Sequence, residues 1–306
     1  RIIVIVGPTC SGKTSLSVQL AEMLNTEIIS ADSRQFYKFL NIGTAKPSKE
    51  ILNKVKHHFI NSLNPDEEYN VSRYEEDASK IIRALIIKNK IPIVVGGSGL
   101  YIKALIDGVV ETADKDDEYR EKLLLIKKED GIEKLYAMLE DVDEVSAKKM
   151  LPQNWKRVMR ALEVFHITGK PIWEHYKNQN KKREFNFIQY GLKWEREILY
   201  KNIDTRVDKM IEQGLIDEVK NILEIGYSPE LNALNTVGYK EIISHLKKEI
   251  TLDRAIELIK RNTRRYAKRQ ITWFNKDKRI NWIDIKSNSD ISRAAGLIIR
   301  EQNLQA

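Results

Sequence analysis

The chain contains a single cysteine, Cys10, among its 306 residues. One thiol cannot form an internal disulfide or build a cysteine-based zinc finger, so a reducing cytoplasm is the expected compartment. No apolar run approaches the roughly 18 to 20 residues that span a bilayer, and no signal peptide pattern is found, so we expect no membrane partner. Low-complexity segments and obvious repeats are also missing. These absences favour a globular protein, and the chain is long enough to bury a substantial core.

The charge is only mildly positive, with 52 Lys and Arg against 44 Asp and Glu. Such an excess indicates a polyanionic partner only where basic residues cluster. They do so in "AIELIKRNTRRYAKRQITWF", where three- and four-residue spacing predicts a broad basic helix face. Its members are Lys260, Arg261, Arg264, Arg265, Lys268 and Arg269. A smaller set, Lys156, Arg157 and Arg160, surrounds Trp155. An ordinary solvated face is the alternative, but we favour binding to nucleic-acid phosphates.

The segment "IVIVGPTCSGKTSL" fits the phosphate-binding pattern G-x-x-x-x-G-K-[ST]. An apolar strand at 2–6 precedes the loop and a helix follows it, so backbone N–H groups and the helix dipole would point at an anion. Lys13 would add a movable charge, and Thr14 would hold Mg2+. A fortuitous glycine turn is the alternative. The pattern comprises Gly7, Pro8, Thr9, Cys10, Ser11, Gly12, Lys13 and Thr14.

Apolar strands that alternate with helices predict an α/β fold with a parallel sheet in three layers. The expected strands span 2–6, 27–30, 92–95, 185–194 and 279–285, and a helix is expected at 72–90. The segment 113–184 is highly charged, lacks strand patterns and has helical periodicity, so we predict a helical insertion there. The α/β core is then discontinuous and comprises 1–112 and 185–306. Ligands are expected at the carboxyl ends of the strands.

An acid that commonly ends a buried strand in ATP-hydrolysing proteins of this kind is missing, because "IPIVVGGSG" ends in glycines and a serine. Asp32 is the only acid at a comparable strand end. It could ligate magnesium through water, accept a proton from a substrate, or cap the following turn, and we favour the first two roles. His57 and His58 are adjacent and are predicted to be structural.

Eight segments together resemble the bacterial tRNA dimethylallyltransferase (tRNA isopentenyltransferase) family over nearly the whole chain. They are "GPTCSGKT", "ISADSRQFYK", "NIGTAKP", "VVGGSGLY", "RALEVFHITGKP", "RVDKMIEQGLIDEV", "VGYKEI" and "KRNTRRYAKRQITWF". The resemblance implies a fold like that of P-loop kinases, with an inserted helical subdomain that grips the tRNA anticodon stem-loop. It also implies transfer of the dimethylallyl group from dimethylallyl diphosphate to N6 of adenosine 37, next to the anticodon, with release of diphosphate.

The resemblance also implies roles for individual residues. Asp32 matches the base that takes the N6 proton, and Thr9 and Ser98 match positions near the reacting groups. Arg206 matches an arginine that reaches the diphosphate, although an ion pair with a neighbouring Asp204 or Asp208 is the alternative. Further tRNA contacts, beyond the basic residues above, are implied for Ser33, Arg34, Gln35, Arg120, Gly238 and Tyr239.

The expected partners are therefore tRNA and dimethylallyl diphosphate, with Mg2+ as cofactor and a monomer as the working form. A free adenine-nucleotide prenyltransferase or a small-molecule P-loop kinase is the main competing hypothesis, because the phosphate loop and Asp32 would suffice for either. A non-catalytic RNA-binding protein with this fold is a third. Neither a free-nucleotide prenyltransferase nor a small-molecule kinase explains the two basic surfaces.

Overall fold

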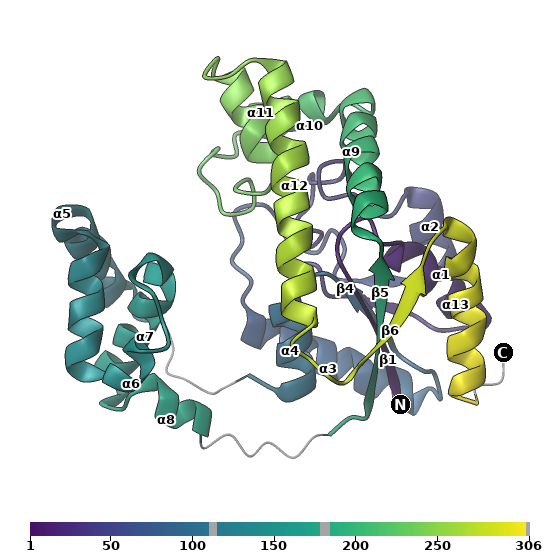
Figure 1. Cartoon of the computed structure of the whole chain (residues 1–306), viewed down its shortest axis with the longest axis horizontal. Helices are drawn as coiled ribbons and strands as arrows, with labels where there is room; N and C mark the ends of the chain where they lie inside the picture. Colours follow the sequence, from purple (N-terminus) through teal and green to yellow (C-terminus); the bar gives the residue numbers. More distant parts are fainter. Residues whose placement is uncertain (110–114, 178–183, 304–306) are drawn as a thin grey trace. The chain divides into compact units, whose positions relative to one another are not determined.

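The computed structural model of the chain describes residues 1–109, 115–177 and 184–303. The chain divides into two compact units, of which one joins Arg1–Asp107 to Arg183–Ala306 and the other is Gly108–Lys182. The first unit contains a six-stranded parallel sheet in the order β3-β2-β4-β1-β5-β6 (Figure 1). This confirms the predicted α/β class. The strands are β1 (Ile2–Val6), β2 (Ile28–Ser30), β3 (His57–His58), β4 (Ile93–Gly96), β5 (Phe187–Trp194) and β6 (Ile280–Ile285).

The central strand β1 is buried on both faces, as expected for a parallel sheet covered by helices. Ile2, Val4 and Val6 contribute to one hydrophobic core, and Ile3 and Ile5 contribute to the other. Successive side chains of a strand point to opposite faces, so one apolar run supplies both cores. The five predicted strands are present within a few residues of their expected bounds. The sixth, β3, was missed because it has two residues, both histidine.

Helices cover both faces of the sheet. The helices α1 (Lys13–Met23), α9 (Arg196–Glu212) and α13 (Asn288–Glu301) supply residues to the core that contains Ile3. The other core draws on α3 (Val71–Ile87), α4 (Gly99–Asp107), α10 (Leu215–Glu224) and α11 (Tyr239–Leu246). The long α12 (Leu252–Phe274) contributes to both and packs beside α9 and α11 (Figure 1), while α2 (Lys49–Lys54) is short.

The second unit is helical in its described residues. It consists of α5 (Asp117–Val142), α6 (Glu144–Ala147), the 3-10 turn η1 (Pro152–Asn154), α7 (Trp155–Thr168) and α8 (Ile172–Lys177). Its own core includes Leu123, Leu139, Val158 and Leu162. The unit overlaps the insertion predicted for 113–184, but the predicted boundary at 112–113 lies outside the described residues. Across the described parts of both units, the helices are too short or too polar to cross a membrane.

Candidate phosphate-binding active site

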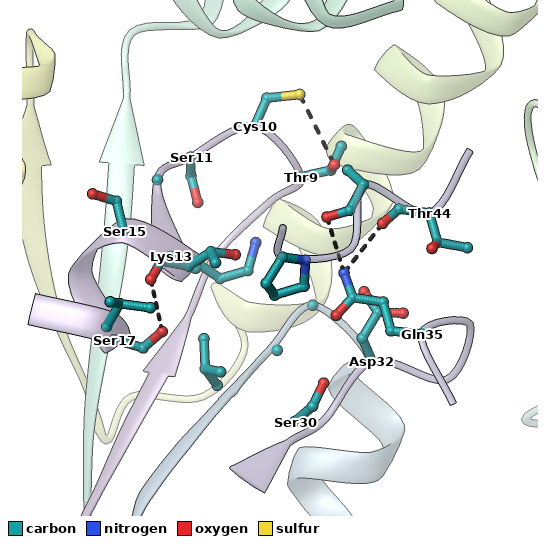
Figure 2. A pocket seen from close by; sticks show the side chains of 18 of the residues that line it. Thr9, Cys10, Ser11, Lys13, Ser15, Ser17, Ser30, Asp32, Gln35 and Thr44 are labelled. Atoms are coloured by element: carbon teal, nitrogen blue, oxygen red, sulfur yellow. Dashed lines mark hydrogen bonds between the residues drawn. The ribbon is translucent and has the colours of Figure 1, made fainter. Parts of the chain in front are cut away.

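The structure confirms the predicted order of strand, loop and helix. Residues 7–14 form the loop, which is here called the phosphate loop. β1 ends at Val6 and α1 begins at Lys13. Gly12 has φ 87° and precedes the helix, and a Cβ atom built there would lie 2.3 Å from the Ile291 side chain. The backbone angle therefore favours glycine, and a larger residue would also displace the end of the Ile291 side chain. The loop lines a cavity of about 550 Å³, and Figure 2 shows Lys13 on one side of it with Asp32 and Gln35 on the other.

Lys13 is a half-buried cation, and among the described residues no carboxylate is in direct contact with it. Its Nζ donates a hydrogen bond to the Pro8 carbonyl at 2.6 Å. Burial lowers the pKa of Lys13 to about 8, the charge of Asp32 opposes this change, and Arg206 adds to it. A bound anion would favour the charged amine, so the site is electrostatically suited to a phosphate group.

Asp32 follows β2 and lies in the cavity wall. Its Oδ1 accepts a hydrogen bond from the Arg34 backbone amide at 2.9 Å, so the residue does cap the following turn. Among the described residues nothing donates to its second carboxylate oxygen. One oxygen therefore has a structural role, and the other remains available to a ligand or a proton.

Ser98 lies in the loop after β4, close to Asp32 in space. Its Oγ accepts a hydrogen bond from the Ser33 amide at 3.1 Å. Tyr266, on α12, lines the first cavity together with Asp32, whereas Ser98 is not among the lining residues. Burial, followed by the charge of Asp32, raises the pKa of Tyr266 to about 12, although a hydrogen bond with Ser98 acts in the other direction. Tyr266 is thus a neutral hydroxyl at physiological pH. The sequence analysis did not assign it a site role.

A second cavity of about 350 Å³ adjoins the first. Its wall includes Ser33, Arg34 and Gly238, which were predicted to contact tRNA. The two cavities have six lining residues in common, which are Thr9, Asp32, Thr44, Ala45, Arg206 and Tyr266. Two ligands, one in each cavity, would therefore meet at Asp32.

Arg206 lines both cavities from α9, and neither alternative ion pair forms. Asp204 pairs instead with Arg264, and Asp208 lies 2.6 Å from Lys260. Within the described structure Arg206 has no carboxylate partner, so its guanidinium is available to an anion. Both acids that could have neutralised it are held by α12.

Gln270 was missed by the sequence analysis. Its Oε1 accepts a hydrogen bond from the Thr9 amide at 2.8 Å, and its Nε2 donates to the Gly97 carbonyl at 2.9 Å. A Cβ atom at Gly97 would lie 2.2 Å from that Nε2, so the close approach depends on glycine. The side chain ties the phosphate loop to the loop after β4. The only sequence signal is an uncharged polar residue on the buried side of a basic helix.

Glu218, on α10, was also missed. Its carboxylate accepts hydrogen bonds from the amides of Asn41, Ile42 and Gly43 at 2.9–3.2 Å and from the Tyr239 hydroxyl at 2.6 Å. These contacts hold the "NIGTAKP" loop, which contributes Thr44 and Ala45 to both cavities. Tyr239 is fully buried, so its side chain does not face solvent at the position where a tRNA contact was predicted. Its role is to hold Glu218 and the loop.

Gly238, Arg34 and Gln35 are held by hydrogen bonds to other parts of the chain. The Gly238 amide donates to Glu241 at 2.8 Å, and the Arg34 guanidinium donates to the Asn232 carbonyl at 2.7 Å. The Gln35 amide donates to the Thr44 carbonyl at 3.1 Å. The three residues lie in cavity walls, but these bonds also give them structural roles.

The basic face of α12 is smaller than expected. Arg265, Lys268 and Arg269 are exposed. Lys260 and Arg264 pair with Asp208 and Asp204 of α9, so these two members of the predicted basic face are neutralised. The remaining member, Arg261, is half-buried, and its Nε lies within the protein. The acids that pair with α12 are more than 50 residues away in sequence, where helical periodicity gives no signal.

The basic set Lys156, Arg157 and Arg160 of the helical unit is also partly neutralised by an acid, because Arg160 pairs with Glu163. Glu163 is fully buried and lies 2.6 Å from Arg120, and it also pairs with Arg160. Burial raises the pKa of Glu163, but hydrogen bonds from these two arginines and from the Asp116 amide hold it below its ordinary value. Lys156 and Arg157 are exposed, so they are the cations of this set that face solvent.

The histidines have the structural roles predicted for them. His57 Nδ1 lies 2.7 Å from the Val55 carbonyl, and His58 Nε2 lies 2.7 Å from Glu27. In the part of the chain that the structure describes, no group of three His, Cys, Asp or Glu side chains could hold a metal ion. A metal at this site would therefore take most of its ligands from phosphate and water oxygens, which is usual for Mg2+.

A phosphate loop at the carboxyl edge of a parallel sheet, with a second cavity that meets it at one carboxylate, defines a P-loop α/β transferase with room for two ligands. Residues 35–277 match the family model described as IPP transferase. The chain belongs to this family.

Similar proteins carry a consistent description. The chain is 44% identical over 301 residues to a tRNA dimethylallyltransferase of Natranaerobius thermophilus, which covers 97% of this chain and 90% of the relative. It is 47% identical over 287 residues to that of Acetivibrio thermocellus, with 93% and 91% covered.

Two solved structures share the fold. The tRNA isopentenylpyrophosphate transferase of Bacillus halodurans superposes with a TM-score of 0.72 at 36% identity, covering 98% of this chain and 96% of that one. A eukaryotic dimethylallyltransferase acting on tRNA gives a TM-score of 0.85 at 32% identity, covering 99% and 78%.

Proposed function

We propose that the protein transfers the dimethylallyl group of dimethylallyl diphosphate to N6 of adenosine 37 in tRNA and releases diphosphate. The observation that carries this proposal is the position of Asp32 in the wall shared by two cavities, one of which contains the phosphate loop. Family membership supports the same reaction. A monomer in the cytoplasm is the proposed working form.

The donor diphosphate would bind at the phosphate loop. Backbone amides of the loop, Lys13 and Arg206 would surround it. As the allylic C–O bond breaks, negative charge accumulates on the leaving diphosphate, and cations and N–H groups already in position stabilise that charge without reorganising. The lowered pKa of Lys13 fits this role, because an anion raises the charged fraction of the amine.

The adenine base would occupy the second cavity, with N6 next to Asp32. The N6 lone pair is delocalised into the ring, so the amine is a poor nucleophile. A carboxylate oxygen of Asp32 takes the N6 proton while the new C–N bond forms and the C–O bond of the donor breaks. The Thr9 and Ser98 hydroxyls would position the reacting groups. Ser98 is already joined to the Asp32 turn through the Ser33 amide.

Mg2+ fits the donor set of the site. The Thr14 hydroxyl would ligate it directly and Asp32 through water, both with the hard oxygen atoms that this ion prefers. When bound, the ion neutralises part of the charge on the diphosphate. Hard oxygen donors and the lack of a closed ligand cluster among the described residues support magnesium over a softer metal.

The anticodon stem-loop would contact cations of both units. Arg265, Lys268 and Arg269 on α12 and Lys156 and Arg157 on α7 are exposed and suited to RNA phosphates. The target base must leave its stack to reach Asp32, which costs less in a loop than in a duplex.

An acceptor assay tests the proposal. Radiolabelled dimethylallyl diphosphate is incubated with the enzyme, magnesium and either tRNA, AMP or ATP. We expect label in tRNA only, and a tRNA with guanosine at position 37 should remain unlabelled. Label in AMP but not in tRNA would favour a free-nucleotide prenyltransferase, and phosphoryl transfer from ATP without prenylation would favour a kinase.

A further inference from the structure

A third cavity of about 1070 Å³ lies beside the phosphate loop. Its described lining residues include six cations and no Asp or Glu. It is formed by the "NIGTAKP" loop, α2 and a stripe of α9. The stripe includes Lys201 and Lys209, whereas Asp204 and Asp208 of the same helix pair with α12. The lining cations are Lys38, Lys46, Lys49, Lys201, Arg206 and Lys209. We call this cavity the cationic hollow.

Most charges of the hollow lack carboxylate partners. Lys49, Lys201 and Lys209 are exposed, and none of them forms an ion pair with a described residue. Lys46 donates to neutral oxygen atoms, among them Oδ1 of Asn61 at 2.5 Å. Lys260 and Arg264, by contrast, pair with Asp208 and Asp204 of α9. Like charges around one cavity repel each other, and an anion inside relieves that repulsion.

The hollow is continuous with the phosphate-binding cavity. The two have five lining residues in common, which are Cys10, Gly12, Ala45, Pro47 and Arg206. Arg206 would therefore contact an anion in either position. The wall also has apolar side chains, which suit a ligand with a charged head and an apolar body. They are Phe39, Ile42, Leu52 and Met210.

We propose that the cationic hollow captures an organic diphosphate from solution and delivers it to the phosphate loop. The inference rests on the proposed function for the identity of the diphosphate as the prenyl donor. Cations that line a cavity concentrate an anionic ligand and raise its association rate by about 10- to 1000-fold at low ionic strength. The exposed cations of α12, where RNA is proposed to bind, do not line this hollow.

The test compares two triple variants with equal loss of charge. Lys49→Gln, Lys201→Gln and Lys209→Gln together neutralise the hollow. Lys276→Gln, Lys278→Gln and Lys286→Gln are the control, because these lysines are exposed and lie in none of the three cavities. For the first variant we expect kcat/KM for dimethylallyl diphosphate to fall about tenfold at low salt and to approach the wild type at high salt.

Two further measurements separate the outcomes. Titration with inorganic diphosphate by calorimetry should show weaker, less salt-dependent binding for the hollow variant, and this readout needs no transfer reaction. The KM for tRNA should be unchanged. If the hollow variant equals the control in both assays, the inference is wrong; if only the KM for tRNA rises, the hollow binds RNA and the inference is also wrong. Failure of the wild type to prenylate tRNA would overturn the proposed function and leave the titration as a separate test.

Discussion

The side-chain oxygen of Gln270 lies 2.8 Å from the backbone nitrogen of Thr9, 261 residues away in sequence. The same side chain donates to the Gly97 carbonyl. One amide thus joins α12 to the first residues of the phosphate loop and to the loop that carries Ser98. Because the exposed cations of α12 lie within two turns of Gln270, a single rigid helix connects the proposed RNA surface to the proposed leaving-group site.

Replacing Gln270 with Ala should raise the KM for dimethylallyl diphosphate about tenfold, because the two hydrogen bonds that join the phosphate loop to the loop after β4 are lost. Gln270→Glu should act similarly, since it keeps the acceptor for Thr9 but places a carboxylate against the Gly97 carbonyl. Steady-state kinetics with each substrate varied in turn measure the effect. Thr272→Ala, on the exposed side of α12, is the control. An equal rise in the KM for tRNA would indicate general damage rather than positioning.

Asp32→Asn should reduce kcat by about 100- to 10,000-fold and leave tRNA affinity nearly unchanged. Asparagine keeps an oxygen that can accept the hydrogen bond from the Arg34 amide, so the turn should survive while the proton acceptor is lost. Single-turnover transfer and a filter-binding assay measure the two quantities. Unchanged transfer would remove Asp32 from the mechanism and favour a purely capping role.

Lys13→Met should stabilise the ligand-free protein by about 1 kcal/mol at pH 7 while abolishing diphosphate binding. The pKa of Lys13 is about 8 in the folded protein against an ordinary 10.5, so the charged amine carries a penalty below pH 8. Between pH 8 and pH 10.5 the unfolded chain binds more protons than the folded protein, so the wild type becomes more stable as pH rises. The difference in unfolding free energy between Lys13→Met and the wild type should therefore become smaller over this range. Urea unfolding at several pH values tests this, with the exposed Lys88→Met as control. A pH-independent difference would contradict the burial argument.

Lys268→Gln with Arg269→Gln should weaken tRNA binding and reduce its salt slope by about 0.7 to 0.9 per lost phosphate contact. Arg264→Gln should change the slope much less, because Arg264 pairs with Asp204. Binding is measured by filter retention at several salt concentrations. If Arg264→Gln has the larger effect on the slope, the ion pair must open in the complex.

Glu163→Gln should destabilise the helical unit by about 2 kcal/mol, because it leaves the Arg120 and Arg160 guanidinium groups without their buried carboxylate. The pKa of Glu163 is lower in the folded protein than in the unfolded chain. Its ionised carboxylate therefore stabilises the fold above the unfolded-state pKa, and this stabilisation is lost as pH falls through the folded-state pKa. Hydrogen exchange of amides in α5 and α7 reports this unit separately. The exposed Glu121→Gln should have no comparable effect.

Local patterns were sufficient to predict the phosphate loop, most strands and the position of Asp32. A buried parallel strand needs a continuous apolar run, and a phosphate loop needs glycines and a lysine at set spacing. Both β1 and residues 7–14 could therefore be predicted from one short segment of the sequence. The short strand β3 has no such pattern.

Contacts between distant segments depended on the tertiary structure. Gln270 bonds to Thr9, Glu218 accepts hydrogen bonds from the loop at 41–43, and Asp204 forms an ion pair with Arg264. All of these contacts depend on how the helices pack. Residue type and spacing show which side chains a helix presents, but not which partner lies opposite. The phosphate loop could therefore be predicted from its own residues. The cationic hollow could not, because it depends on the packing of α9 beside the 41–47 loop and on the pairing of Asp204 and Asp208 with α12.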